Sequence, residues 1–281
     1  MYPVEKKRTK RDQYRTNAEL IQNHQLEGER MSVRTFAITD KAGTKNISLD
    51  LVRCYNLGFT MRDAEKMQRH LEECYKLGIK ELICDRPPLV MPISDWAVLT
   101  DTAITVQRPK SSGEVEIVTL VDENDTIYVT VGSDHTDRSL EGIDIPWGKQ
   151  VTPNVVAPHA WRWDEVKDHW DQVTMECWVI DGGHHMKYQE ALVNEFWTPA
   201  EMLQGVRDSV VKVPGAIILF SGTVVSIEEK LRFAESWTIK MIDPVLNRTI
   251  EHTYTVSVLA GEVLNDGSAT GDIAKGEALT G

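Results

Sequence analysis

One stretch of the sequence decides how the fold is read: Ser112-Gly113-Glu114-Val115-Glu116-Ile117-Val118. In a β-strand, successive side chains point to opposite faces, so Glu114 and Glu116 share one face and the apolar residues share the other. A turn-forming segment at 122–125 follows, and a second β-patterned run occupies residues 127–131. The pattern predicts two strands, at 115–121 and 127–131, joined as a hairpin.

The two carboxylates of this strand allow two interpretations. Like charges about 7 Å apart on one face repel each other unless a cation lies between them. Hard divalent cations prefer such oxygen ligands, and Asp134, one strand away, could supply a third carboxylate. The same spacing also arises wherever a strand shows a polar face to solvent, so the pattern alone leaves both interpretations open.

Composition limits the class of protein. The chain has 281 residues, of which 41% are hydrophobic, enough to bury a sizeable core. It has no run of 18 apolar residues and no apolar region behind its basic N-terminus, so we expect no membrane span, no secretory signal and a cytoplasmic location. The net charge of −12 argues against nucleic-acid binding, although a basic cluster at residues 6–15 could form an RNA- or lipid-contacting arm.

The organisation along the chain predicts one catalytic domain at 31–261, between a polar N-terminal extension at 1–30 and a flexible C-terminal tail at 262–281. Most predicted elements are short strands, at 33–38, 47–51, 89–93, 103–106, 175–180, 185–188, 216–220, 237–242 and 249–259. Helices are predicted from the N-cap Thr60 to Gly78, at 163–171 and at 198–206. The absence of regular β-α-β alternation in this pattern predicts an α+β fold that is mainly β, with mixed sheet and peripheral helices.

Several short motifs follow one another along the chain: Pro87-Pro88-Leu89, Glu114-Val115-Glu116, Ser133-Asp134-His135-Thr136-Asp137-Arg138, Trp147-Gly148-Lys149, Gln189 and Ser221-Gly222-Thr223. In this order they resemble the fumarylacetoacetate hydrolase family and look closest to a branch of that fold usually described as having unknown function. The resemblance covers about residues 48–258 and implies the mixed β-sheet roll of that family's C-terminal domain. The chain departs from the family in the connection between Glu116 and Asp134, which is shorter than usual.

The resemblance also implies roles for particular residues. Glu114, Glu116 and Asp134 would hold Mg²⁺ or Mn²⁺, a donor set that suits an octahedral oxygen site. Lys149 would stabilise negative charge on an enolate or carboxylate. Four further residues would orient the substrate: Arg138, Gln189, Ser221 and Thr223.

Three other residues are candidates for acid–base chemistry. His70 and Glu73 form the His-x-x-Glu pair with which the family's hydrolases activate water on a lid helix, but neighbouring positions on a surface helix need no function. His135, next to Asp134, could be a ligand, a general base or a hydrogen-bond donor behind the ligands.

These implications favour a divalent-metal-dependent enzyme that acts on a small oxo-acid and forms a homodimer. C–C bond hydrolysis, decarboxylation, hydration and isomerisation through a metal-stabilised enolate all remain open. The alternative is a non-catalytic small-molecule-binding or structural protein that retains the fold.

Overall fold

The structure of the protein is a computed structural model that describes residues 32–65, 67–68, 72, 87–210 and 215–262. The N-terminal extension predicted at 1–30 lies outside these residues, as does the C-terminal tail predicted at 262–281 apart from its first residue.

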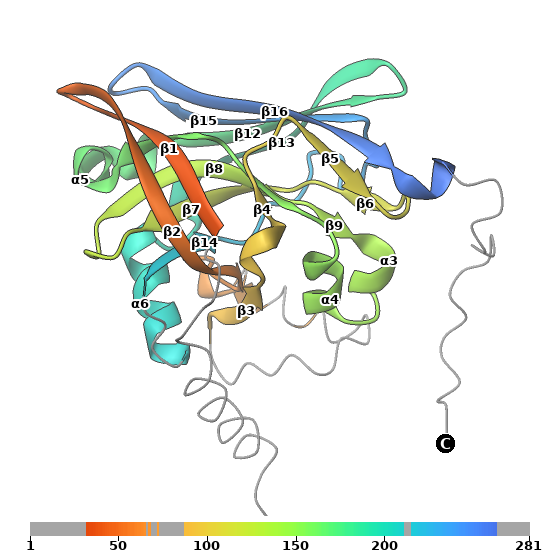
Figure 1. The fold of residues 1–281 in the computed structure, drawn as a ribbon, viewed down its shortest axis with the longest axis horizontal. Coiled ribbons are helices and arrows are strands. Elements are labelled where there is room, and N and C mark those ends of the chain that lie inside the picture. The colour runs from red at the N-terminus through yellow and green to blue at the C-terminus, as the bar shows by residue number, and fades with distance from the viewer. Residues whose placement is uncertain (1–31, 66, 69–71, 73–86, 211–214, 263–281) are drawn as a thin grey trace, which may run out of the picture.

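A closed β-barrel forms the centre of the fold (Figure 1). It is built from β1 (Ser32–Asp40), β2 (Gly43–Gly58), β14 (Ala216–Phe220), β7 (Val115–Val121), β8 (Ile127–Asp134) and β11 (His159–Arg162). They pair in the order β11-β1-β2-β14-β7-β8, and β8 pairs back with β11 to close the ring. The β1–β11 and β2–β14 pairs are parallel and the others antiparallel, so the barrel is mixed and leaves none of these six strands with an open edge.

Short strands extend the barrel sheet at one end. β3 (Leu89–Ile93) pairs with the second half of β2, and β10 (Asn154–Val156) joins the end of β8 to β4 (Val98–Leu99). β6 (Ser111–Ser112) and β9 (Thr136–Asp137) form a separate two-stranded ladder next to the ends of β7 and β8. The carboxyl end of β8 is therefore surrounded by backbone on several sides.

A second sheet covers one side of the barrel and runs across the top of Figure 1. Its strands are β13 (His184–Leu192), β12 (Thr174–Asp181), β15 (Ser236–Asp243), β16 (Arg248–Val258) and β5 (Ala103–Val106), in that order. Buried residues alternate with half-buried ones along β15, the period-two pattern of a sheet with one face on a core. One hydrophobic cluster lies between this sheet and the barrel, and a second, which includes Phe36, Ile38 and Phe220, fills the barrel.

The helices are short and peripheral: α3 (Arg138–Glu141), α4 (Ile145–Gln150), α5 (Trp163–Val166) and α6 (Pro199–Ser209), with 3-10 turns η1 (Asp95–Ala97), η2 (Lys167–Gln172), η3 (Val193–Glu195) and η4 (Leu259–Glu262). α6 begins with the predicted capping box, in which Thr198 and Glu201 cap each other's backbone N–H groups. The mainly β class with peripheral helices is confirmed. The helix predicted at 163–171 is instead one α-turn followed by a 3-10 segment that is kinked at His169.

The helix predicted from Thr60 begins later than expected. Thr60 is buried, and its hydroxyl donates to the carbonyl oxygen of Ser221. Asp63 caps the helix instead, because its Oδ1 accepts from the N–H of Glu65 at 2.9 Å, and the described residues from 64 to 72 are helical. The predicted pair His70 and Glu73 lies outside the described residues.

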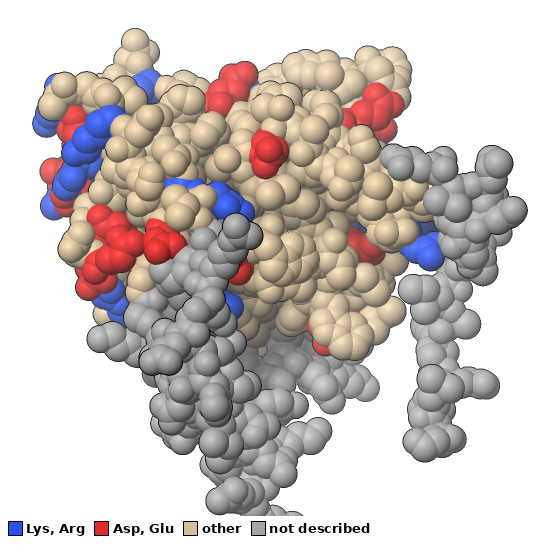
Figure 2. All heavy atoms as spheres, in the orientation of Figure 1, with Lys and Arg blue, Asp and Glu red and all other residues tan. Residues whose placement is uncertain are grey.

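Both positively and negatively charged side chains lie on the surface of the molecule. On the face shown in Figure 2, Lys and Arg side chains are interspersed with Asp and Glu near one edge, and most of the face carries neither. Among the described residues, no helix has the length and apolar character needed to cross a membrane.

Candidate metal centre

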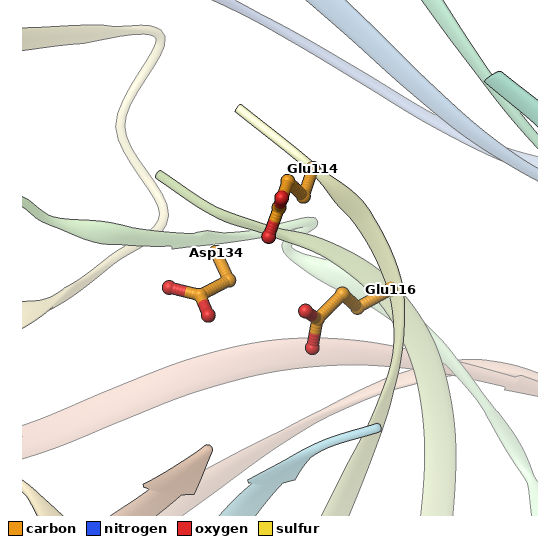
Figure 3. Close-up of side chains that lie close together, drawn as sticks. All are labelled: Glu114, Glu116 and Asp134. Carbon is orange, nitrogen blue, oxygen red and sulfur yellow. The ribbon is translucent and has the colours of Figure 1, made fainter. Parts of the chain in front are cut away.

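The β7–β8 hairpin brings three carboxylates together (Figure 3). Val115 pairs with Ser133 and Glu116 with Gly132, and one residue further along the backbone N–H of Asp134 donates to the carbonyl of Glu114 at 3.2 Å. Glu114 and Glu116 lie two residues apart and therefore project to the same side. One oxygen from each of Glu114, Glu116 and Asp134 lies within 4.8 Å of the others, so the three side chains can bind one metal ion.

Burial makes this concentration of negative charge costly. Glu116 and Asp134 are each 1% exposed, and the Glu114 side chain is 13% exposed. Burial, with the nearby charge of Asp134 next in size, raises the pKa of Glu116 well above its usual range. Burial also raises the pKa of Glu114, although Arg138 and Lys149 oppose this shift. The group therefore favours any cation, or proton, that reduces its charge.

Lys149 lies in the same group. It extends from α4, which begins at Asp144, whose side chain accepts from the N–H of Trp147. Its Nζ contacts Oδ2 of Asp134 and lies 3.9 Å from Oε2 of Glu114. Burial alone would lower the pKa of Lys149, but the carboxylates outweigh burial and raise it, so the side chain stays protonated.

Arg138 holds Glu114 from the other side. Its Nη2 forms an ion pair with Oε1 of Glu114 at 2.6 Å, while Nη1 bonds to Glu141 at 2.7 Å and Nε to the hydroxyl of Ser112 at 2.6 Å. Three partners fix the guanidinium plane, so Arg138 orients the Glu114 carboxylate as well as compensating its charge.

The predicted Ser221-Gly222-Thr223 segment also reaches the group, but through its backbone. Gly222 donates its N–H to Oε2 of Glu116 at 2.9 Å. It has φ of +85°, and a Cβ there would lie 2.9 Å from the carbonyl oxygen of Leu57, so only glycine fits this approach. Ser221 accepts from the N–H of Ile117 at 3.1 Å and thereby joins this segment to β7.

Gln189 and Thr223 are engaged with backbone next to the group. Oε1 of Gln189 accepts from the N–H of Val115 at 2.9 Å, and its Nε2 donates to the Thr223 hydroxyl at 2.9 Å and to the carbonyl of Val224 at 2.6 Å. Thr223 in turn donates to the carbonyl of Val115 at 3.2 Å. Both residues therefore hydrogen-bond to the backbone of Val115 in β7, between Glu114 and Glu116.

His135 lies beside the carboxylates, and its ring nitrogens bond elsewhere. Its Nδ1 is 3.1 Å from the hydroxyl of Tyr254 and its Nε2 is 3.0 Å from the hydroxyl of Ser111. Burial, with a smaller effect of the Arg138 charge, lowers its pKa to about 3, so the ring is neutral. Both nitrogens face protein hydroxyls, which is the geometry expected of the third role that the sequence left open, a hydrogen-bonding residue behind the ligands.

Sequence reasoning missed several contacts of the site. Glu141, which holds Arg138, belongs to no motif quoted above, and Ser112 was quoted without any role. Tyr254 comes from the second sheet. One signal was available: Asp137 within the Ser133–Arg138 motif caps α3 by accepting from the N–H groups of Ser139 and Leu140.

A surface pocket of about 310 Å³ lies elsewhere on the molecule, between α6 and the Pro87-Pro88 segment. Its lining includes the apolar side chains of Pro88 and Trp197 and the acidic side chains of Glu201 and Asp208. None of the three carboxylates lines this pocket, and the candidate metal centre is identified by the convergence of its side chains.

Solved structures of similar fold come from several enzymes. The apo form of 2-keto-3-deoxy-D-arabinonate dehydratase is 14% identical, with a TM-score of 0.53 and 78% of each chain covered. The same enzyme complexed with magnesium and 2,5-dioxopentanoate is 14% identical, with a TM-score of 0.51 and again 78% of each chain covered. A protein of Escherichia coli is 11% identical, with a TM-score of 0.51, and the match covers 78% of this chain and 99% of that one.

At these identities the likeness is one of fold, and it confirms the resemblance to the fumarylacetoacetate hydrolase fold that the motifs predicted. No curated protein matches the chain. The sequence pattern of one protein family matches residues 57–254, which include every residue of the candidate metal centre. The chain therefore belongs to that family, which is described as "Protein of unknown function (DUF2848)".

Proposed function

We propose that this protein is a divalent-metal-dependent enzyme that acts on a small oxo-acid, with Mg²⁺ or Mn²⁺ held by Glu114, Glu116 and Asp134. The observation that carries the proposal is the convergence of three carboxylates within 4.8 Å in a buried position. Lys149 and Arg138 pair with Asp134 and Glu114, but the three buried carboxylates still stand against only two cationic side chains among the described residues. Buried charge without a full counter-charge is costly, and hard divalent ions bind carboxylate oxygens well.

The donor set fits these ions better than it fits softer metals. All three side chains supply oxygen, and the two described cysteines, Cys54 and Cys177, are buried free thiols outside the group. Oxygen donors suit Mg²⁺ and Mn²⁺, while thiolate and imidazole donors suit zinc and copper. The fold neighbour that is complexed with magnesium and 2,5-dioxopentanoate supports the choice of metal and of substrate class.

A bound Mg²⁺ or Mn²⁺ would act as a Lewis acid toward a keto or enol oxygen and a carboxylate oxygen of the substrate. Lys149 would stabilise the negative charge that develops on an enolate, and its raised pKa makes it a donor of hydrogen bonds rather than a base. Arg138 would keep Glu114 in place while Ser221, Gln189 and Thr223 hold the strand that carries Glu116 and orient the substrate.

The reaction that we propose belongs to the enolate class: C–C bond hydrolysis of a diketo acid, decarboxylation, hydration or isomerisation. Hydrolysis needs a base to activate water. His135 does not meet this need, because burial lowers its pKa to about 3, which makes the ring a weak proton acceptor, and because both nitrogens are engaged by protein hydroxyls. His70 and Glu73 remain the predicted pair for that role. Loss of hydrolysis in His70→Ala with metal binding retained would support it.

A second candidate function is a non-catalytic protein that retains the fold. The observation in its favour is that Lys149 and Arg138 already pair with Asp134 and Glu114, so the group has internal charge compensation. A thermal-shift titration with Mn²⁺ separates the two candidates, because an ion that binds only the folded state raises its stability. A rise in melting temperature that is lost in Glu116→Ala supports the metal enzyme, and equal curves with and without Mn²⁺ support the alternative.

The substrate is tested by a screen of 2-oxo and 2,4-dioxo acids with Mg²⁺ or Mn²⁺ present, with Lys149→Met as the inactive control.

We also propose that the protein is a cytoplasmic homodimer and that its barrel is a divergent form of the fumarylacetoacetate hydrolase roll. The segment 225–233 supports a dimer because it exposes apolar side chains, among them Val225 at 71% and Ile227 at 56%. Light scattering on the purified protein would test the dimer.

A further inference from the structure

A row of buried hydrogen bonds connects the second sheet to the candidate metal centre. Ser111 Oγ lies 3.0 Å from Nε2 of His135, whose Nδ1 lies 3.1 Å from the hydroxyl of Tyr254. The Tyr254 hydroxyl lies 2.7 Å from the hydroxyl of Ser133, and Ser133 Oγ accepts from the backbone N–H of Glu114 at 3.1 Å. The row thus ends on the backbone of a candidate metal ligand.

The hydrogen-bonding capacity of Ser133 favours one direction for the row. A backbone N–H can only donate, so Ser133 is the acceptor from Glu114 and its own hydroxyl hydrogen is free to donate to Tyr254. In this direction Tyr254 would donate to Nδ1 of His135, and the ring would carry its proton on Nε2 and donate it to Ser111. The opposite order would leave the Ser133 hydroxyl hydrogen without the acceptor that the structure gives it.

The row is buried and closely packed. Ser133, His135 and Tyr254 are each 0% exposed, and Ser111 is 4% exposed. A Cβ on Gly113 would lie 2.4 Å from the Tyr254 hydroxyl and 2.7 Å from the Ser133 hydroxyl, so the chain next to Glu114 lies directly against the row. His135 is further held edge-on against Trp237 and Tyr254, with ring centroids 5.9 Å apart in both pairs.

Glu114 is consequently held at two points by different parts of the protein. Arg138 holds its carboxylate, and the Ser133–Tyr254 pair holds its backbone N–H. Removing a residue that orients a metal ligand lowers the metal affinity, because the ligand side chain then loses conformational freedom when the metal binds.

We propose that Ser111, His135, Tyr254 and Ser133 form one directed hydrogen-bond chain, and that Tyr254 is a positioning residue that fixes Glu114 for metal binding. The second sheet thereby contributes to a site whose ligands all come from the barrel hairpin. The effect on metal binding rests on the proposed metal function, whereas the direction of the chain does not.

The first measurement uses the unsubstituted protein and needs no metal. Long-range ¹H–¹⁵N correlation spectra distinguish a protonated ring nitrogen from an unprotonated one. The expected result is His135 with its proton on Nε2 and a bare Nδ1. A proton on Nδ1 would overturn the directed chain, whatever the protein does with metals.

The second measurement is a Mn²⁺ titration of Tyr254→Phe, which removes only the hydroxyl. We expect affinity to fall about 10-fold, the lower end of the effect of such supporting groups. Tyr188→Phe is the matched control: Tyr188 is also buried and packs on Trp237 at 5.4 Å, but its hydroxyl bonds to the backbone of Arg232, outside the chain. Ser133→Ala, which removes the direct contact with Glu114, should weaken Mn²⁺ binding at least as much and serves if Tyr254→Phe does not fold.

The outcomes separate the two proposals. Weaker binding in Tyr254→Phe and Ser133→Ala but not in Tyr188→Phe supports the positioning role. Unchanged Mn²⁺ affinity in either of the first two variants overturns it. If the unsubstituted protein binds no Mn²⁺, the metal function fails and the positioning role fails with it, while the tautomer of His135 still decides whether the chain is directed.

Discussion

Replacing Glu116 by glutamine should make the metal-free protein more stable and should abolish its stabilisation by metal. The substitution keeps the shape of the side chain and one oxygen atom. In the unsubstituted protein Oε2 of Glu116 accepts from the N–H of Gly222 at 2.9 Å, and the amide oxygen of glutamine can accept the same hydrogen bond. It removes one charge from a buried group in which three carboxylate oxygens lie within 4.8 Å. Without a bound cation, the main change is therefore the loss of repulsion from Glu114 and Asp134.

The size of the effect follows from Coulomb's law. Two unit charges 4.8 Å apart interact by about 3.5 kcal/mol at an effective dielectric constant of about 20. Lys149 attracts Glu116 in the native protein, and burial with the nearby Asp134 charge raises the pKa of Glu116 and so favours its uncharged form; both effects reduce the gain. We expect a net gain of about 1–2 kcal/mol, which corresponds to about 2–4 °C in melting temperature per kcal/mol for a domain of this size.

With Mn²⁺ the order of the two proteins should reverse. A ligand at 100 times its dissociation constant stabilises the folded state by about 2.7 kcal/mol, a gain that only the unsubstituted protein should show. The assay is thermal unfolding of both proteins with Mn²⁺ and with chelator. Glu176→Gln is a suitable control, because it removes a carboxylate that pairs with Lys187 outside the group. If Glu116→Gln melts below the unsubstituted protein in chelator, or gains equally from Mn²⁺, the electrostatic reasoning is refuted.

Three further predictions concern other parts of the structure. Gly113→Ala places a Cβ 2.4 Å from the Tyr254 hydroxyl and should cost about 1–3 kcal/mol in denaturant unfolding, and a neutral result would mean that the close approach is not real. Lys149→Met should abolish turnover of any oxo-acid substrate. It should keep a Mn²⁺-dependent thermal shift at least as large as before, because the Lys149 ammonium that pairs with Asp134 no longer competes with the metal ion. Loss of the shift would contradict this. Asp243→Asn should cost about 1.5–3 kcal/mol at neutral pH, because the side chain is 0% exposed and bonds to Arg248. Although burial opposes the shift, the close contact of His169 at 3.0 Å and hydrogen bonds from backbone N–H groups and Arg248 lower the pKa of Asp243 in the folded state. This stabilisation is therefore present above the ordinary Asp pKa of about 3.9 and is lost as pH falls below it. Urea titrations at several pH values would show the difference between the two proteins shrinking in acid, and a constant difference would contradict the assignment.

The strands whose residues face apolar surroundings were predictable from sequence. β7 and β14 have the predicted bounds because every residue of β7 and nearly every residue of β14 is buried, which leaves a continuous β-branched and aliphatic run. β8 was predicted to end at Val131 but continues to Asp134, because its last residues are polar and buried and pair with β10. A hydrophobic pattern ends where a polar site begins, so it cannot mark the end of a strand that carries the site.

The short helices escaped prediction for a different reason. α3 has 4 residues and α4 has 6, which is too short for a helical period to be visible in the sequence. Their caps, Asp137 and Asp144, carried the available signal. Packing decides the rest: a Cβ on Gly148 would lie 2.7 Å from the backbone nitrogen of Glu141, so α4 lies directly against α3 and delivers Lys149 to the carboxylates.

The short connection between Glu116 and Asp134 brings the candidate ligands together. Asp122 closes the turn by accepting from the N–H groups of Asn124 and Thr126 at 2.9 and 2.8 Å, and this sets Val121 opposite Ile127. In an antiparallel hairpin without a bulge, one pair of facing residues determines all the other pairs. A slip of one residue would move every side chain of a strand to the opposite face. The register carried along β7 and β8 places Asp134 across from Glu114, and Glu116 follows on the same face. The tight hairpin therefore fixes the relative positions of the candidate ligands through strand register, whereas a longer connection would have to fix them by packing. The turn that sets this register lies at the opposite end of β7 and β8 from the ligands.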